Sequence, residues 1–145
     1  MVSTVYAIRL GDAQIITVPG ELFPEVYYGV ATHRREGCPK ADTGRPAEPA
    51  VRDFMDARYK FVFGLSPDEM GYLVPGYDFH APSFDPEKGL QESKDACAGV
   101  PTHYHETNSA SSQLAPGWAC TAVELLRGKS TDIPACAGRR NQTQH

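Results

Sequence analysis

The chain has 145 residues, of which 41% are hydrophobic and 10% aromatic, and its formal net charge is −4. This is the length of one ordinary domain, and the acidic balance argues against a nucleic-acid-binding protein, which normally has a basic face. No apolar run reaches the roughly 18 to 20 residues that a transmembrane helix needs, so no transmembrane segment is expected. The first residues also lack the basic and apolar regions of a signal peptide.

The N-terminal segment predicts a hairpin followed by a helix. Val5 to Leu10 and Gln14 to Val18 are two apolar, β-branched runs that a Gly-Asp turn separates, which favours a β-hairpin. A Pro-Gly pair ends the second run, and residues 21–33 carry apolar side chains at helical spacing. Glu21 is then expected in the first helical turn, where the helix dipole favours a carboxylate.

The middle of the chain predicts a loop, a short helix and a strand. Residues 34–48 contain turn formers and charges of both signs, so we expect a surface loop or an insertion there. Pro49 to Ala57 fits a short helix, and Tyr59 to Leu65 alternates and is rich in aromatics, which indicates a strand ending at Gly64. A short acidic loop and then Tyr72 follow, a position where α/β proteins often carry functional residues.

The C-terminal part predicts a second long loop, a His-rich segment and a helix. Residues 80–101 are polar without a sustained period, so we expect an insertion there, and residues 129–145 form a polar tail. Between them, Pro116 is expected to open a helix, where proline is tolerated, and Gly128 to end it. The apolar face of this helix contains Trp118, Ala122, Val123, Leu125 and Leu126. The whole pattern predicts an α/β fold: a small mixed β-sheet with packed helices and two long loops.

The four cysteines are widely spaced and include no CxxC pair, which disfavours a zinc ribbon or a thioredoxin-like motif. An even number is compatible with two disulfides and an oxidising compartment. Of the three connectivities, we favour Cys120 with Cys136 and Cys38 with Cys97, because the second pair lies in polar loops rich in Pro and Gly. Free, partly buried thiols are the alternative.

Three motifs, in this order, resemble the neutral/alkaline, non-lysosomal ceramidase family. They are PGELF at residues 19–23, GLSPDEMGYLVPGYDF at residues 64–79, and HYHETNSAS at residues 103–111 before the Pro-started helix. Relatives of that family have P-G/A-E after a strand, then G-L-x-N-D-E-x-G-Y, and then Y-E-x-x-x-S. The resemblance covers most of residues 5–127 apart from the two loops. It implies that residues 1–145 are a partial catalytic domain, its later half.

The resemblance implies a zinc-dependent amidohydrolase that cleaves the N-acyl amide of ceramide-like lipids. In that family two histidines, one glutamate and one tyrosine hold the zinc, and by motif position the last two are Glu21 and Tyr72 here. The two histidines and the family's serine, implicated in catalysis, would come from sequence before Val5. The missing N-terminal half of the domain is therefore the expected partner of this chain. The family and the four cysteines suggest an extracellular or periplasmic location.

A second metal site can be formulated from residues of this chain alone. His103, His105 and Glu106 are close in sequence, and His80 is a candidate fourth ligand. On a strand, His103 and His105 would share one face and could bind one ion together. By the family pattern, however, His105 stands where relatives have Glu. Pairs of this kind also occur in ordinary polar loops.

The adjacent carboxylates Asp68 and Glu69 allow two interpretations. They could form an acid/base pair of the glycosidase type. Neighbouring residues of an extended segment point to opposite faces, so we favour the alternative, in which one of them braces the loop.

Two functions of other classes are also compatible with the sequence. The first is a non-catalytic, disulfide-stapled module for a lipid or a partner, in which aromatic side chains line a groove. Its aromatic residues would be Tyr27, Tyr28, Tyr59, Tyr77 and Trp118. The second is a fragment that folds only on a partner chain, which would expose its hairpin and its apolar helix faces.

Overall fold

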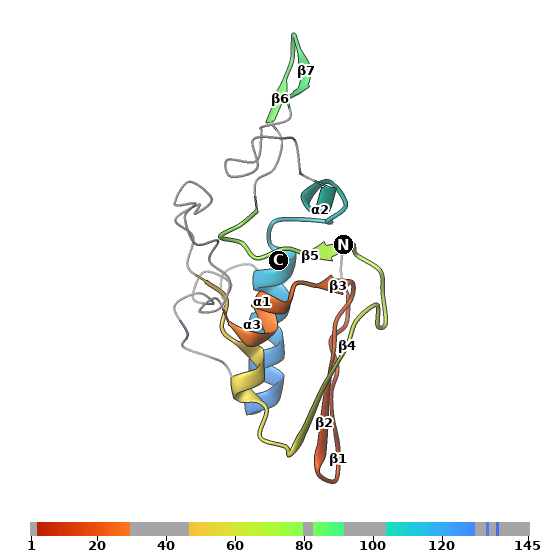
Figure 1. Ribbon diagram of the computed structural model, residues 1–145, viewed down its shortest axis with the longest axis vertical. Coiled ribbons are helices and arrows are strands. Elements are labelled where there is room, and N and C mark those ends of the chain that lie inside the picture. The colour runs from red at the N-terminus through yellow and green to blue at the C-terminus, as the bar shows by residue number, and fades with distance from the viewer. Residues whose placement is uncertain are drawn as a thin grey trace.

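The computed structural model describes residues 3–29, 47–79, 83–91 and 104–129, together with Ile133 and Cys136. Its elements are β1 (Ala7–Leu10), β2 (Ala13–Thr17), β3 (Glu21–Leu22), α1 (Pro24–Tyr28), the 3-10 helix η3 (Val51–Phe54), β4 (Tyr59–Phe63), β5 (Tyr72–Leu73), β6 (Ser83–Asp85), β7 (Gly89–Gln91), α2 (Tyr104–Thr107) and α3 (Leu114–Arg127). This is the predicted α/β class, a small mixed sheet with a few helices (Figure 1). Within the described ranges, no helix has the length and apolar character to cross a membrane.

The main sheet has the strand order β1-β2-β4. β1 and β2 are antiparallel and form the predicted hairpin, with Gly11 at a φ of 57° in its turn. β4 pairs in parallel with β2, so that Ile15 lies opposite Phe61 and Ile16 opposite Val62. The predicted strand at Tyr59 is therefore confirmed, and it ends at Phe63.

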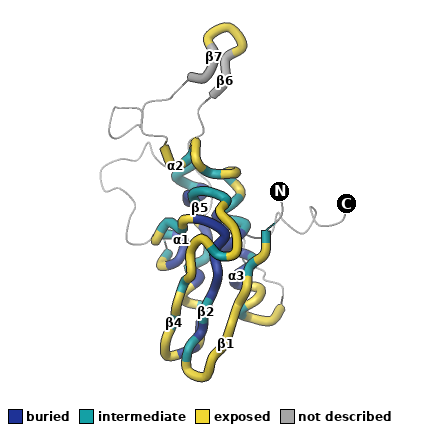
Figure 2. Tube along the Cα trace, turned by 90° about the vertical axis from the view of Figure 1, so that its right-hand side faces the viewer, coloured by how far each residue is buried: buried dark blue, intermediate teal, exposed yellow. Residues whose placement is uncertain are grey.

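The hydrophobic core lies between one face of this sheet and the helices α1, η3 and α3. Ile16 and Val18 are fully buried there. From α3, the Trp118 indole Nε1–H donates a hydrogen bond of 2.8 Å to the carbonyl of Thr17, which ties the helix to the central strand. In Figure 1 the sheet is seen nearly edge-on with α1 and α3 on one side of it, and Figure 2 looks at its other face.

The long helix α3 is largely as predicted. It ends at Gly128, which has a φ of 67° and is therefore in the left-handed conformation typical of a helix C-terminus. It begins at Leu114, two residues earlier than predicted, so Pro116 lies within its first turn. Leu125 was expected on the apolar face but is 44% exposed, whereas Trp118 and Val123 are buried.

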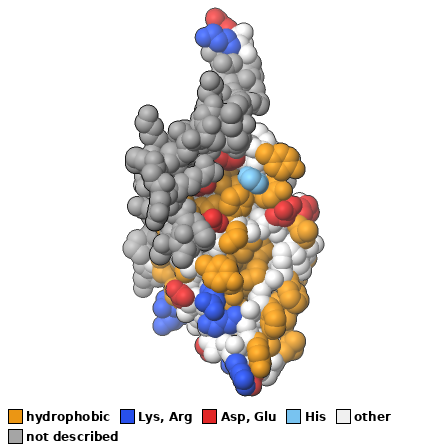
Figure 3. Space-filling view, in the orientation of Figure 1, with side chains coloured by type: hydrophobic (Ala, Val, Ile, Leu, Met, Phe, Trp, Pro, Cys, Tyr) orange, Lys and Arg blue, Asp and Glu red, His pale blue; other side chains and the backbone are white. Residues whose placement is uncertain are grey.

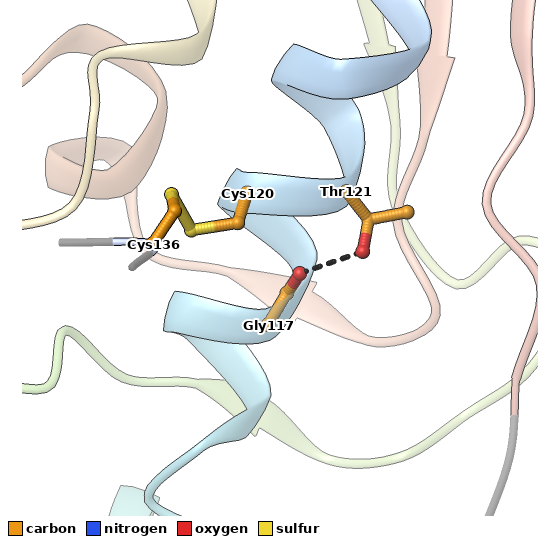
Figure 4. Close-up of a disulfide and its surroundings, with 4 residues drawn as sticks. All are labelled: Gly117, Cys120, Thr121 and Cys136. Carbon is orange, nitrogen blue, oxygen red and sulfur yellow. Dashed lines mark hydrogen bonds between the residues drawn. A yellow bond between two sulfur atoms is a disulfide. The ribbon is translucent and has the colours of Figure 1, made fainter. Parts of the chain in front are cut away.

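A disulfide joins Cys120 of α3 to Cys136, which confirms this predicted pair (Figure 4). The two Cα atoms are 5.7 Å apart, and both cysteines are buried. On another side of the same helix, the hydroxyl of Thr121 donates to the carbonyl of Gly117 at 2.9 Å. The expected partners Cys38 and Cys97 lie outside the described residues.

The helix predicted over residues 21–33 is shorter than expected and begins later. Glu21 belongs to the strand β3, so its assignment to a first helical turn was wrong. α1 begins at Pro24, the position where a proline without an N–H is best accommodated, and Tyr28 is its last residue, followed by Gly29 at a φ of 94°. His33 lies outside the described ranges.

The two predicted loops also need correction where the structure describes them. Part of residues 80–101 forms a hairpin of its own, because β6 and β7 pair antiparallel. These strands have three residues each, too few for a recognisable alternation. Glu48, the last residue of the other loop, is buried, and its Oε1 accepts a hydrogen bond of 2.7 Å from the backbone N–H of Gly76.

Candidate metal centre

Backbone hydrogen bonds join the two sequence stretches that carry the PGELF and GLSPDEMGY motifs. The N–H groups of Leu65 and Ser66 donate to the carbonyls of Gly20 and Val18 at 3.0 and 2.9 Å. Further along, the N–H of Met70 donates to the Pro19 carbonyl at 2.9 Å. Residues 65–73 of the second motif therefore lie beside residues 18–23.

This pairing places Glu21 beside Tyr72. The strands β3 and β5 are parallel, and Glu21 is the direct partner of Tyr72 in their register. The N–H of Glu21 donates to the carbonyl of Gly71 at 3.0 Å. Neighbouring strands lie about 4.8 Å apart, and the side chains of Glu21 and Tyr72 are within hydrogen-bonding reach of each other, so the carboxylate and the phenol can meet the same ion.

A third segment fixes β5 from its other side. The N–H of Tyr72 donates to the carbonyl of Asn108 at 3.1 Å, and Gly71 forms a β-bridge with Ser109. The approach is close, because a Cβ atom on Gly71, whose φ is 80°, would overlap the Asn108 carbonyl. A Cβ on Gly20 would likewise overlap the carbonyl of Gly71. The two glycines therefore let three backbones approach one another at the pair.

An aromatic cluster surrounds the Tyr72 ring. His105 packs edge-to-face on it with ring centroids 4.7 Å apart, and Tyr104 does so at 5.8 Å. Phe23 contacts the imidazole of His105 at 5.0 Å. Figure 3 shows a histidine side chain among hydrophobic side chains, with acidic side chains nearby.

Sequence reasoning did not assign Phe23 and Tyr104 to the site. Both stand inside the quoted motifs, Phe23 two residues after the glutamate and Tyr104 in HYHE. The recurrence of an aromatic residue in each of the three motifs is the signal that could have identified the cluster. Any one motif considered alone does not reveal the cluster, since an isolated aromatic residue is ordinarily a core residue.

The pKa of Tyr72 is raised above its ordinary value of 10.0. Desolvation by the surrounding groups is the largest cause, followed by the negative charge of Glu21 and by Tyr104. Side-chain hydrogen bonds with Tyr104 and Glu21 act in the same direction because they favour the protonated phenol. Without a cation, the pair therefore keeps its phenolic proton.

The Glu21–Tyr72 pair fits a zinc ion in donor chemistry. Zinc binds carboxylate oxygens at about 2.0 to 2.2 Å, and a nearby cation would oppose the rise in the phenol pKa. Glu21 is exposed and Tyr72 partly exposed, so solvent reaches the pair. Two oxygen ligands are fewer than the three protein ligands of a catalytic zinc site, so further ligands are required.

The alternative site of His103, His105 and Glu106 lies only partly within the described residues. Residues 104–107 form the helix α2 and not a strand, so alternating positions there do not share one face. The His105 imidazole packs among aromatic rings. His80 and His103 lie outside the described ranges, and within these ranges no three His, Cys, Asp or Glu side chains form a metal-binding group.

The acidic pair Asp68 and Glu69 braces the loop before Tyr72, as we favoured. A carboxylate oxygen of Glu69 accepts a hydrogen bond of 2.9 Å from the N–H of Gly71. The Asp68 carboxylate accepts one from the hydroxyl of Ser3. Glu69 therefore holds the backbone directly before Tyr72, and Asp68 links the loop to the N-terminal segment.

Comparison with known proteins assigns no family to the chain. No protein-family model, curated protein or solved structure matches it. The interpretation of the site therefore depends on the geometry above and on the motif resemblance.

Proposed function

We propose that this chain supplies the glutamate and tyrosine ligands of a ceramidase-like, zinc-dependent amidohydrolase. In this proposal Glu21 and Tyr72 bind the zinc, and two histidines and a serine come from a polypeptide segment outside residues 1–145. The substrate is a ceramide-like lipid whose N-acyl amide is cleaved. The single observation that supports the proposal is the direct register of Glu21 with Tyr72 on adjacent parallel strands.

The residues of this chain have separate tasks in the proposed site. Glu21 offers its carboxylate, and Tyr72 offers its phenol oxygen once its proton is released to solvent. The packed rings of Tyr104 and His105 hold the Tyr72 ring in place. When bound, zinc would supply Lewis acidity and would lower the pKa of a water molecule towards about 7.

Zinc binding by the purified chain tests the ligand assignment. We expect weak Zn²⁺ binding in equilibrium dialysis, which Glu21→Gln or Tyr72→Phe reduces at least about tenfold, because each removes one of two oxygen donors. Tyr59→Phe is the matched control, since Tyr59 is a 49% exposed tyrosine on β4 and its loss should leave binding unchanged. Equal Zn²⁺ binding by the wild type and the three variants would refute the assignment.

Hydrolysis of a short-chain fluorescent ceramide tests the completeness of the site. We expect no turnover by this chain alone, with or without a chelator, because the described residues supply only two of the ligands. Chelator-sensitive turnover would show instead that this chain completes the site by itself. Glu21→Gln should change the free energy of unfolding by less than about 0.5 kcal/mol, since Glu21 is exposed and caps no helix.

The competing proposal of an aromatic-lined binding groove is less well supported. Trp118 and Tyr27 are core residues that are 3% and 7% exposed, so neither lines an open groove. Tyr28 and Tyr59 are exposed, but they belong to different elements, α1 and β4.

A further inference from the structure

The outward-facing side of the main sheet is hydrophobic over its whole extent. Its large side chains, which we call the outer sheet face, are Tyr6, Ile8, Leu10, Tyr59, Phe61 and Phe63. Their exposed fractions range from 40% to 63%. Their in-register neighbours on β2 are Ala13, Ile15 and Thr17, so the paired strands place no charged residue on this side, and the nearest charge is the Arg58 guanidinium over the Tyr59 ring at its edge. A sheet face in contact with water normally alternates to polar residues.

The helices that cover the sheet all lie on its opposite side. Ile16 of β2 and Val62 of β4 point into the core with α3, and strand alternation turns Ile15 and Phe61 the other way. Figure 2 looks directly at this side, where β1 and β4 are exposed, and Figure 1 shows no described element over it. In Figure 3 hydrophobic side chains stand along the same side of the molecule.

The remaining residues of this chain are not suited to cover the face. Outside the described ranges the sequence contains no Leu, Ile, Phe, Tyr or Trp. If a polar segment covered these six hydrophobic side chains, its polar groups would lose their hydrogen bonds to water and find no hydrogen-bond partners on the face. Large apolar side chains that cover the face must therefore come from outside residues 1–145.

The area of the face is that of one half of a small protein–protein interface. Aromatic side chains bury about 150 to 250 Å² each and four of the six are aromatic, so the half-exposed set presents on the order of 600 Å² at most. Monomeric proteins rarely expose a larger contiguous apolar patch. Two such faces in contact would bury about 1,200 Å², the lower limit of a standard specific interface.

The face can be applied to a second copy of itself. Neighbouring strands are about 4.8 Å apart, so two copies offset by one strand would each leave β1 uncovered. A two-fold axis that runs parallel to the strands over β2 instead brings β1 of each copy against β4 of the other and covers all six side chains. Such an interface is isologous and closes at the dimer.

We propose that the outer sheet face docks a second copy of this chain, forming a two-fold dimer with two stacked sheets. The two sheets would then enclose a second hydrophobic layer about 10 Å thick. This proposal does not depend on the metal site, because the face and the Glu21–Tyr72 pair belong to different sheets.

Oligomeric state in solution tests the proposal. Sedimentation equilibrium of the wild-type chain should give twice the mass of one chain at high micromolar concentration. Phe61→Glu should weaken this association by more than about tenfold, because the charge would be buried without a partner. Since Phe61 is 46% exposed in the single chain, the variant should keep its fold, which circular dichroism checks.

Leu125→Glu is the matched control. Leu125 is 44% exposed, close to the value for Phe61, but it stands on α3 on the other side of the sheet. Leu125→Glu should dimerise like the wild type. For each of these two proteins, the unfolding midpoint should rise with protein concentration. A wild-type monomer at the highest concentration, growth into larger heterogeneous aggregates, or equal weakening by both variants would overturn the proposal.

Discussion

Two tyrosines show how local surroundings change the same side chain. Tyr72 meets a carboxylate, a second tyrosine and a histidine ring at the candidate metal centre. Tyr27 is instead buried in the core, where its hydroxyl contacts the sulfur of Met55 at 3.6 Å. Burial is the first cause of the raised pKa in both, but only Tyr72 stands beside a carboxylate that could share a cation.

The raised pKa of Tyr27 predicts a loss of stability at alkaline pH. Burial and the neighbouring Tyr28 raise it, and Arg52 partly opposes the shift. Above about pH 10 the unfolded chain releases the phenolic proton before the folded chain does, so the free energy of unfolding must fall as pH rises towards the folded-state pKa. Below pH 10 the contribution is fully present.

Denaturant unfolding at a series of pH values measures this effect. Tyr27→Phe should make the alkaline decline shallower, because the titrating group is removed. Tyr6→Phe is the control, since Tyr6 is 51% exposed and its removal should leave the slope as in the wild type. An unchanged slope in Tyr27→Phe would contradict the prediction.

At the scale of elements, the candidate site depends on β5 lying between two other segments. β5 contacts β3 on one side and the Asn108–Ala110 segment on the other, where the N–H of Ala110 donates to the Met70 carbonyl at 3.0 Å. A strand of two residues cannot be stable alone. Its position is therefore imposed by its neighbours, and Gly71 allows one of them to approach.

Gly71→Ala should disrupt this junction. The added Cβ overlaps the Asn108 carbonyl in a left-handed conformation, so we expect a loss of more than about 2 kcal/mol in the free energy of unfolding. Gly11→Ala is the control, because Gly11 also has a positive φ but nothing lies within 4 Å of its added Cβ. It should lose only about 1 kcal/mol. Equal losses would show that close approach at Gly71 contributes nothing.

At the scale of the whole molecule, the sheet is covered by helices on one side and hydrophobic on the open side, whereas the covered side also carries Arg9, Gln14 and Lys60. The Cys120–Cys136 disulfide adds a covalent link on the covered side, where α3 packs. A chain with a single small core gains from such a link because it restricts the unfolded state.

Removal of this disulfide should destabilise the fold markedly. The cysteines are 16 residues apart, and closing a loop of that size contributes about 3 kcal/mol. We expect Cys120→Ala combined with Cys136→Ala to lower the free energy of unfolding by about that amount in chemical denaturation. Thr121→Ala, which removes only a hydrogen bond within the same helix, should be nearly neutral. A double variant as stable as the wild type would show that the link constrains little.

Much of the local structure was predictable because it depends on neighbouring residues. The Gly-Asp turn at Gly11 predicted the β1–β2 hairpin, and the alternation from Tyr59 predicted β4. Prediction failed where contacts with segments distant in the sequence determine the local structure. Glu21 follows a Pro-Gly pair and precedes helical spacing, yet hydrogen bonds to the Gly71 region draw it into a strand. Likewise, Leu125 fits the apolar helix pattern but faces away from the core.

The amino-acid sequence by itself determined the α/β class, the hairpin and α3 with its Gly128 end, and its motif resemblance proposed Glu21 and Tyr72 as ligands. These follow from turn chemistry, periodicity and motif, which act over a few residues. Only the tertiary structure decided that Glu21 and Tyr72 are strand partners, that Tyr104 and His105 pack on the Tyr72 ring, and which side of the sheet stays open. Those arrangements depend on backbone pairing and packing between segments far apart in the chain, which no local pattern encodes.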